Sequence, residues 1–258
     1  MLMRYAFITI AQAFCSHALA LQPESQDGVA GEQRIPFTNR LLAFRALKQG
    51  LKFRFDDWRM WANYMIVAMD VGELSEACRA LGRIVEERSA KDGVASVDED
   101  VLERLVNAST HGSREGEASD AGSRHWNEGL LRQVSDLFDR VILPRVSSPR
   151  IFRAQARLLT AQGRLEDALK AYLSAYQNGI AGTIEKGETD AEKWRQGVKE
   201  VEEMVSVLQN FGPKIEGQKW RLQAKSILRT FMGRTRDFED EPEWTHLTAL
   251  QEELRQED

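Results

Sequence analysis

A helix–turn–helix pattern that occurs twice constrains the fold of this chain more than any other feature of its sequence. In the copy spanning 58–88, apolar residues recur at helical spacing on both sides of Gly72. That spacing places one apolar stripe on each of two helices. Gly72 stands where the first helix has to end in a residue free to take positive φ, and the small Ala77 lets the helices cross closely. The two stripes consist of Trp61, Tyr64, Met65 and Ala68, then Leu74, Ala77, Leu81 and Ile84.

A partial copy precedes this helix pair at a fixed distance. Ala43 stands 34 residues before Ala77, and Leu47 stands 34 residues before Leu81. A period of that length is the signature of the tetratricopeptide repeat, a helix–turn–helix unit that stacks on its neighbours. The pattern predicts an all-α fold of tetratricopeptide-type helical repeats, stacked as a short right-handed solenoid with C-terminal capping helices.

The second complete copy occupies 152–176. Its turn, 163–168, repeats the Gly-x-Leu-x-(Glu/Asp)-Ala pattern of 72–77. Ser148 followed by Pro149 is typical of a helix cap and first turn. The two turns are 91 residues apart, which is not a multiple of 34, so we expect less regular helices and an insertion between them.

The sequence divides into five expected parts. We predict a poorly structured or mispredicted N-terminal segment, a half-repeat plus a complete repeat, helices with a disordered insertion at 110–124, a second complete repeat, and capping helices. Their bounds are 1–39, 40–92, 93–147, 148–180 and 181–258. Outside the repeats, helices are expected at about 98–109, 127–143, 190–211, 217–232 and 244–254, with loops at 179–187 and 234–242.

The first twenty residues resemble a secretory signal only superficially. An apolar run at 5–14 follows Arg4 and precedes Ala18-Leu19-Ala20, but polar residues interrupt the region. The alternatives are a fragment of an upstream repeat helix or a misplaced start of translation, and we favour these. We therefore expect a cytoplasmic protein, with the nucleus as a second location, and no membrane span.

Composition argues against several functional classes. The net charge of −5 over 258 residues argues against direct nucleic-acid binding. Cys15 and Cys78 are the only cysteines and lack the spacing of a zinc or redox site, and the four histidines are far apart. No nucleophile elbow, phosphate-binding loop or metalloprotease motif is present. We expect no enzyme activity, no cofactor and no metal.

The first helix of each repeat supplies the candidate binding residues. Arg150, Arg153 and Arg157 fall at i, i+3 and i+7, so they share one helix face and could form bidentate contacts with carboxylates of an acidic or extended partner segment. In the first copy the corresponding positions are Arg59, Ala62 and Ile66. Asn63 lies nearby, so Arg59 and Asn63 are also candidates, with Asn63 as a contact to a partner backbone. The alternative is that the arginines are ordinary solubilising charge.

The neighbours of Asn63 weigh against one familiar kind of partner. Chaperone-binding repeats of this type use a Lys/Asn clamp for a terminal carboxylate, and Ala62 and Ile66 do not supply it. Binding of a heat-shock protein tail is therefore not expected from these positions.

The run 43–88 also resembles the C-terminal part of the tetratricopeptide repeat protein 27 family, whose fungal members are named for maintenance of the cell wall. The residues that carry the resemblance are Ala43-Phe44-Arg45, Trp58-x-x-Trp61-x-Asn63-Tyr64, Asp70-Val71-Gly72-Glu73 and Ser75-Glu76-Ala77. The resemblance implies a large non-enzymatic scaffold with chaperone or spliceosomal assembly proteins as partners, and in fungi a link to cell-wall integrity. Family members are several times longer, so this chain corresponds to their C-terminal portion.

Two functions follow from these observations. The first is a protein–protein interaction scaffold that assists chaperone-dependent assembly of spliceosomal ribonucleoprotein particles. The second is a purely architectural C-terminal piece of a larger repeat scaffold, with no binding site of its own. Exposed apolar surface on the N-terminal half-repeat would favour the second.

Overall fold

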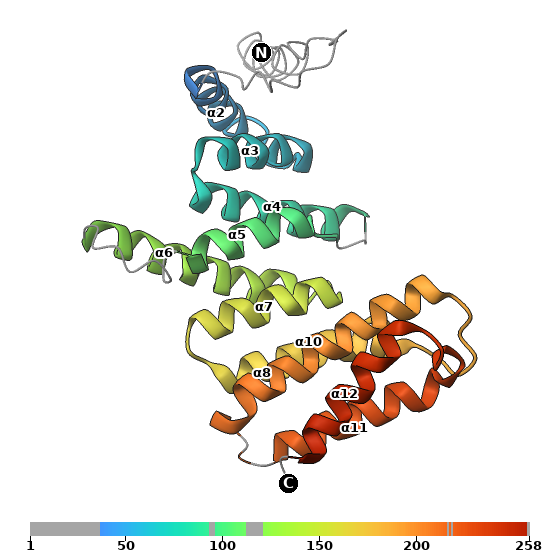
Figure 1. The fold of residues 1–258 in the computed structure, drawn as a ribbon. Coiled ribbons are helices and arrows are strands. Elements are labelled where there is room, and N and C mark those ends of the chain that lie inside the picture. The colour runs from blue at the N-terminus through green and yellow to red at the C-terminus, as the bar shows by residue number, and fades with distance from the viewer. Residues whose placement is uncertain (1–36, 93–95, 112–120, 216, 218, 257–258) are drawn as a thin grey trace, which may run out of the picture. The chain divides into compact units, whose positions relative to one another are not determined.

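In the computed structural model every regular element of the described residues is helical (Figure 1), and these residues are 37–92, 96–111, 121–215, 217 and 219–256. No strand occurs in this part of the chain. The helices are α2 (Phe37–Leu51), α3 (Trp58–Val71), α4 (Leu74–Asp92), α5 (Glu99–His111), α6 (Ala121–Leu137), α7 (Pro149–Ala161), α8 (Leu165–Asn178), α9 (Ile180–Thr183), α10 (Ala191–Ile215), α11 (Lys219–Arg234) and α12 (Pro242–Gln256). A π-helical turn, η1 (Phe138–Ile142), continues α6, and a 3₁₀ turn, η2 (Arg236–Phe238), precedes α12. The predicted all-α repeat fold is confirmed.

The chain forms two compact units. The first lies within 1–101 and 121–146 and contains α2, α3, α4, α6 and η1. The second lies within 102–120 and 147–258 and contains most of α5 and every helix from α7 onward.

The helix pair α3–α4 of the first unit follows the predicted pattern. Asp57 caps α3 by accepting a hydrogen bond from the Arg59 backbone N–H at 3.1 Å, and Gly72 ends it with φ 82°. Tyr64, Ala68 and Ala77 are fully buried at the contact between the helices. The sequence therefore specifies this unit through its cap, its turn and its small residues.

Helix α2 packs on α3 as the expected half-repeat. The Phe44 and Tyr64 rings stack with centroids 5.1 Å apart. Leu47, which lies in register with Leu81 of the complete repeat, is buried like that residue. Residues that are 34 positions apart in the two repeats, such as Leu47 and Leu81, are thus both buried in the core.

The helix after the predicted insertion is longer and less regular than expected. Helix α5 ends at His111, and α6 begins at Ala121. Both ends of the segment predicted to be disordered, 110–124, are therefore helical. Residues 112–120 of that segment lie outside the described residues. At the other end the helix widens into η1, where the Leu143 N–H donates to the Phe138 carbonyl at 3.0 Å, five residues back. The wider turn buries both Phe138 and Ile142.

In the second unit, α7–α8 repeats the construction of α3–α4. The Ser148 hydroxyl accepts a hydrogen bond from the Ile151 N–H at 3.2 Å, and Pro149 occupies the first turn. Gly163 takes φ 75° after α7. The cap, proline and glycine therefore play the parts that the sequence pattern predicts.

The C-terminal helices differ from prediction in three places. Helix α10 was expected to end at Phe211, before Gly212-Pro213, but it continues to Ile215. A proline in the last turn of a helix removes only one hydrogen bond. Trp220 packs directly on Gly212, because glycine has no Cβ; a Cβ at that position would lie 2.3 Å from the Trp220 Cβ. The predicted loop 179–187 contains the short helix α9.

The third difference is in the charged connector predicted at 234–242. It contains η2, which buries Phe238 against Trp194 of α10. The two rings stack with centroids 4.8 Å apart and an angle of 8° between their planes. A single aromatic residue therefore ties this charged segment to the core of the second unit.

Candidate partner-binding site

The three arginines of α7 lie beside a buried apolar face. Ile151, Ala154 and Leu158 are inaccessible to solvent and turn one side of the helix into the core. The side chains of Arg150 and Arg157 keep 46% and 40% of their surface exposed, whereas Arg153 keeps only 23%. The helix therefore presents two arginines to solvent and partly buries the third.

Arg150 and Arg157 meet at one carboxylate. The Glu103 side chain of α5 lies 3.3 Å from Arg150 Nη2 through Oε2 and 3.3 Å from Arg157 Nη2 through Oε1. Arg157 Nη1 also donates to the Asn107 side-chain oxygen at 3.4 Å. Glu103 thus holds two guanidinium groups, two turns apart on α7, in fixed positions.

Arg153 faces a different helix. Its Nη2 lies 2.8 Å from Glu200 Oε1, and its Nε lies 3.0 Å from Glu203 Oε2, both on α10. Glu200 Oε2 also accepts a hydrogen bond from the Ala181 N–H of α9 at 2.9 Å. The predicted row of arginines is therefore divided: two side chains share Glu103, and Arg153 joins α7 to α9 and α10.

Arg59 and Asn63, the other predicted contacts, lie on α3 in the first unit. The Arg59 guanidinium carbon lies 5.5 Å from the centroid of the adjacent Trp58 ring. The Asn63 side chain is exposed and makes no hydrogen bond with any residue that the structure describes. Both residues are exposed to solvent.

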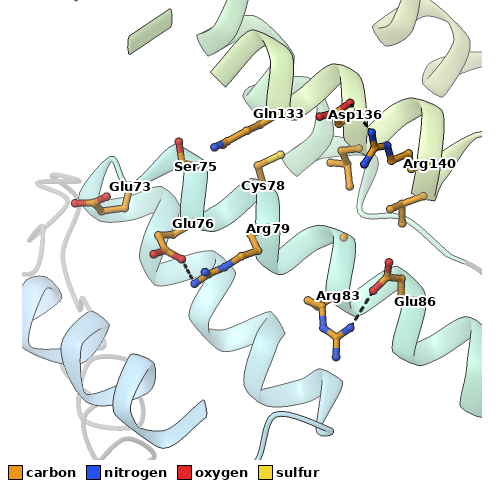
Figure 2. Close-up of a pocket in the computed structure, with 13 residues that line it drawn as sticks. Glu73, Ser75, Glu76, Cys78, Arg79, Arg83, Glu86, Gln133, Asp136 and Arg140 are labelled. Carbon is orange, nitrogen blue, oxygen red and sulfur yellow. Dashed lines mark hydrogen bonds and ion pairs between the residues drawn. The ribbon is translucent and has the colours of Figure 1, made fainter. Parts of the chain in front are cut away.

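A groove that the sequence analysis did not predict lies between α4 and the continuous helix α6–η1 of the first unit (Figure 2). Its volume is about 630 Å³. Gly82 lets the two helices meet, since a Cβ there would lie 3.1 Å from Leu137 Cδ1. Spacing within one helix could not reveal this groove, because its walls come from segments some fifty residues apart.

Two of the basic residues that line the groove pair with acidic residues of their own helices. Arg83 lies 3.1 Å from Glu86 and from Glu87, all three on α4, and Arg140 lies 3.8 Å from Asp136. Cys78 also lines the groove, and Figure 2 shows its sulfur pointing from α4 toward the facing helix. Burial raises the pKa of the Cys78 thiol to about 12, so it stays protonated and has no nucleophilic character at neutral pH.

Glu76, at one end of the groove, connects α4 to α2 of the first unit. It accepts a hydrogen bond from Lys48 of α2 at 2.8 Å and pairs with Arg79 on its own helix. Burial alone would raise the pKa of Glu76, but the hydrogen bond from Lys48, the charge of Arg79 and the nearby Tyr64 hydroxyl together hold it below its ordinary value. Burial, and then the negative charge of Glu76, raise the pKa of Tyr64 far above its usual range.

The described residues form neither a metal site nor a membrane span. Within the described residues, no three His, Cys, Asp or Glu side chains are grouped as metal ligands would be. None of the described helices combines the length and hydropathy needed to cross a bilayer.

The chain is a helical-repeat protein of the tetratricopeptide type. Its helices pair as α3–α4 and α7–α8, and each pair turns at a glycine with positive φ. No family model matches the chain. Its homologues among curated proteins are tetratricopeptide repeat-containing proteins, and they include the fungal cell-wall type that the run 43–88 resembles. The resemblance drawn from the sequence is thereby confirmed.

Three relatives illustrate the similarity. TPR repeat-containing protein C19B12.01 of Schizosaccharomyces pombe is 29% identical over 198 residues, which cover 74% of this chain and 23% of the relative. Essential for maintenance of the cell wall protein 1 of Saccharomyces cerevisiae is 23% identical over 208 residues, 77% of this chain and 22% of the relative. Tetratricopeptide repeat-containing protein trd-1 of Caenorhabditis elegans is 28% identical over 96 residues, 36% of this chain and 12% of the relative.

The chain spans less than a quarter of the length of each of these relatives, between 12% and 23%. Among solved structures, yeast Tom70 aligns with 95% of this chain and 47% of its own at 12% identity, with a TM-score of 0.28. A TM-score that low supports no conclusion about fold or function.

Proposed function

We propose that this chain is a non-catalytic protein-interaction scaffold. The observation that carries the proposal is its similarity, over 74% of its length, to a tetratricopeptide repeat-containing protein. Stacked repeats of this kind present extended surfaces that suit recognition of other proteins. A relative named for maintenance of the cell wall supports a link to cell-wall integrity in fungi, and assistance in assembling spliceosomal particles with chaperones is the finer hypothesis.

The Arg150–Arg157 pair is the proposed contact for an acidic partner segment. A guanidinium group forms bidentate hydrogen bonds with carboxylates, and fixing it before binding reduces the entropy lost on association. Glu103 provides that fixation while leaving both arginines about half exposed. Arg153 acts as a positioning residue through Glu200, and Arg59 and Asn63 are proposed as contacts from the first unit.

The test is affinity purification with mass spectrometry using the tagged chain and two charge-reversal variants. Arg150→Glu/Arg157→Glu changes the proposed contact, whereas Arg104→Glu/Lys199→Glu makes the same change in net charge at exposed positions of the second unit. We expect the first variant to lose assembly proteins captured by the parent chain and the control to retain them. Equal capture by all three proteins would reject the arginine pair as the contact.

The architectural alternative has its own supporting observation. Among the described residues of the first unit, four large apolar side chains are exposed: Leu42 at 50%, Phe53 at 41%, Phe55 at 62% and Ile66 at 54%. Such a concentration on α2, α3 and the segment between them is typical of a surface that another protein covers. If the parent chain and every variant fail to capture assembly proteins specifically, the architectural function is favoured.

A further inference from the structure

The outer face of α11, in the second unit (Figure 1), carries the most exposed large apolar side chain of the described residues. Leu222 keeps 70% of its surface accessible, while Trp220, Ala224 and Phe231 turn the opposite face of the helix into the core. The helix is therefore already anchored by its buried side, and its folding does not require a leucine at 222.

The charges on α11 differ from those of the chain as a whole. Five basic residues and no acidic residue occur in its 16 positions, although the chain has a net charge of −5. The basic residues are Lys219, Arg221, Lys225, Arg229 and Arg234. Lys219 and Arg229 are exposed, and neither forms an ion pair with any residue in the described ranges.

These two cations lie on the same stripe as Leu222. Lys219, Leu222, Ser226 and Arg229 follow one another at i, i+3, i+7 and i+10, so they line one side of the helix. With a rise of about 1.5 Å per residue, Lys219 lies about 4.5 Å before Leu222 along the axis and Arg229 about 10 Å after it. The intervening Ser226 is small and exposed, which leaves room for a second backbone to approach.

We propose that this α11 stripe binds an acidic amphipathic segment of a protein partner. An apolar side chain of that segment packs on Leu222, and carboxylates on either side of it pair with Lys219 and Arg229. This surface is separate from the α7 arginines, so it goes beyond the interaction proposed above and can be tested independently of it.

Charge complementarity selects this occupant over others. A nucleic acid presents a continuous row of phosphates and favours a basic groove with aromatic side chains for base stacking, whereas this stripe offers two separate cations around one leucine and no aromatic residue. A membrane surface requires a broad apolar face, and Leu222 is the one large apolar side chain exposed on α11. An acidic segment with a single apolar anchor satisfies both the leucine and the flanking cations.

The probe is a fluorescein-labelled synthetic helix with glutamates on both sides of one leucine, titrated with the full chain and followed by fluorescence anisotropy. We expect saturable binding that weakens with salt and falls about tenfold or more in Lys219→Glu/Arg229→Glu. Leu222→Ser should weaken binding by about three- to tenfold, since it removes the apolar anchor. Arg104→Glu/Lys199→Glu, and the α7 variant Arg150→Glu/Arg157→Glu, should bind within about twofold of the parent chain.

Three outcomes would overturn the proposal. The first is that Arg104→Glu/Lys199→Glu weakens binding of the probe as much as Lys219→Glu/Arg229→Glu does. The second is that a probe with glutamine in place of every glutamate binds as tightly as the acidic probe. The third is that the chain binds polyuridylate RNA or phosphatidylserine-containing vesicles more tightly than the acidic probe. As a second measurement, a photo-crosslinking amino acid placed at position 226 should capture acidic peptide segments in cells. Crosslinks to RNA, lipid or basic segments would contradict the assignment. All of the substituted positions are at the surface, so a circular dichroism spectrum and melting temperature like those of the parent chain are expected.

Discussion

Arg153 of α7 and Glu200 of α10 form an ion pair in which Nη2 and Oε1 lie 2.8 Å apart. Both side chains are largely buried, with 23% and 13% of their surfaces exposed. The second oxygen of Glu200 accepts the Ala181 N–H, so one carboxylate connects three helices of the second unit. Arg153 is predicted on sequence grounds to bind a partner, and from this geometry we propose that it also positions α7 through Glu200.

The first prediction concerns that carboxylate. Glu200→Ala leaves Arg153 and the Ala181 N–H without this partner, and we expect it to lower the free energy of unfolding by about 1–3 kcal/mol. Urea denaturation followed by circular dichroism measures the change. Glu202→Ala, which affects only a 3.7 Å pair with His246, should change stability by no more than about 0.5 kcal/mol. Similar losses in both variants would show that the three-helix connection is not what stabilises this region.

A second prediction concerns the close approach of α10 and α11. In Gly212→Ala the new methyl group would lie 2.3 Å from Trp220 Cβ, so the helices must separate, at an expected cost of about 1–3 kcal/mol. Gly129→Ala in α6 meets nothing within 4 Å and should instead stabilise by about 0.5–1 kcal/mol, because alanine favours a helix. Thermal denaturation of the two variants should therefore give melting temperatures shifted in opposite directions. A shift in the same direction would contradict the packing argument.

Stability should also depend on the charge of Glu76. Folding lowers the pKa of Glu76 from its ordinary value of 4.5. The stabilisation that the ionised carboxylate provides is therefore fully present above pH 4.5 and is lost as the pH falls through the pKa of the folded state. Lys48→Met removes the 2.8 Å partner and should cost about 0.5–1 kcal/mol near neutral pH. The difference between the parent and Lys48→Met should shrink in strong acid, where the carboxylate is protonated in both. Urea titrations across the acid range measure this, and a pH-independent difference would exclude the ionic contribution.

The buried thiol of Cys78 supplies a kinetic prediction. Its raised pKa of about 12 and its burial should slow alkylation by iodoacetamide more than about a hundredfold relative to the unfolded chain at mildly alkaline pH. The measurement uses Cys15→Ser, which leaves Cys78 as the only cysteine, and mass spectrometry with and without denaturant. Rapid modification of the native protein would show that α4 opens frequently toward the groove.

The local construction of the repeats can be predicted from the amino-acid sequence. Gly72 and Gly163 both adopt the left-handed φ that the shared turn pattern predicts. Ser148 caps α7, and Leu47 and Leu81 are buried at equivalent positions 34 residues apart. These features depend on interactions between residues a few positions apart, so spacing and side-chain size are sufficient to predict them.

The contacts of the exposed and charged residues depend instead on how the helices pack. The sequence places Arg150, Arg153 and Arg157 on one helix face, but two of them meet Glu103 and the third meets Glu200, 47 residues further along the chain. In the same way, α10 continues past Gly212 because Trp220 packs there, and a charged connector is ordered around Phe238. Ion pairs and aromatic stacking join residues distant in the chain, so their partners follow from how the helices pack rather than from the periodicity of any one helix.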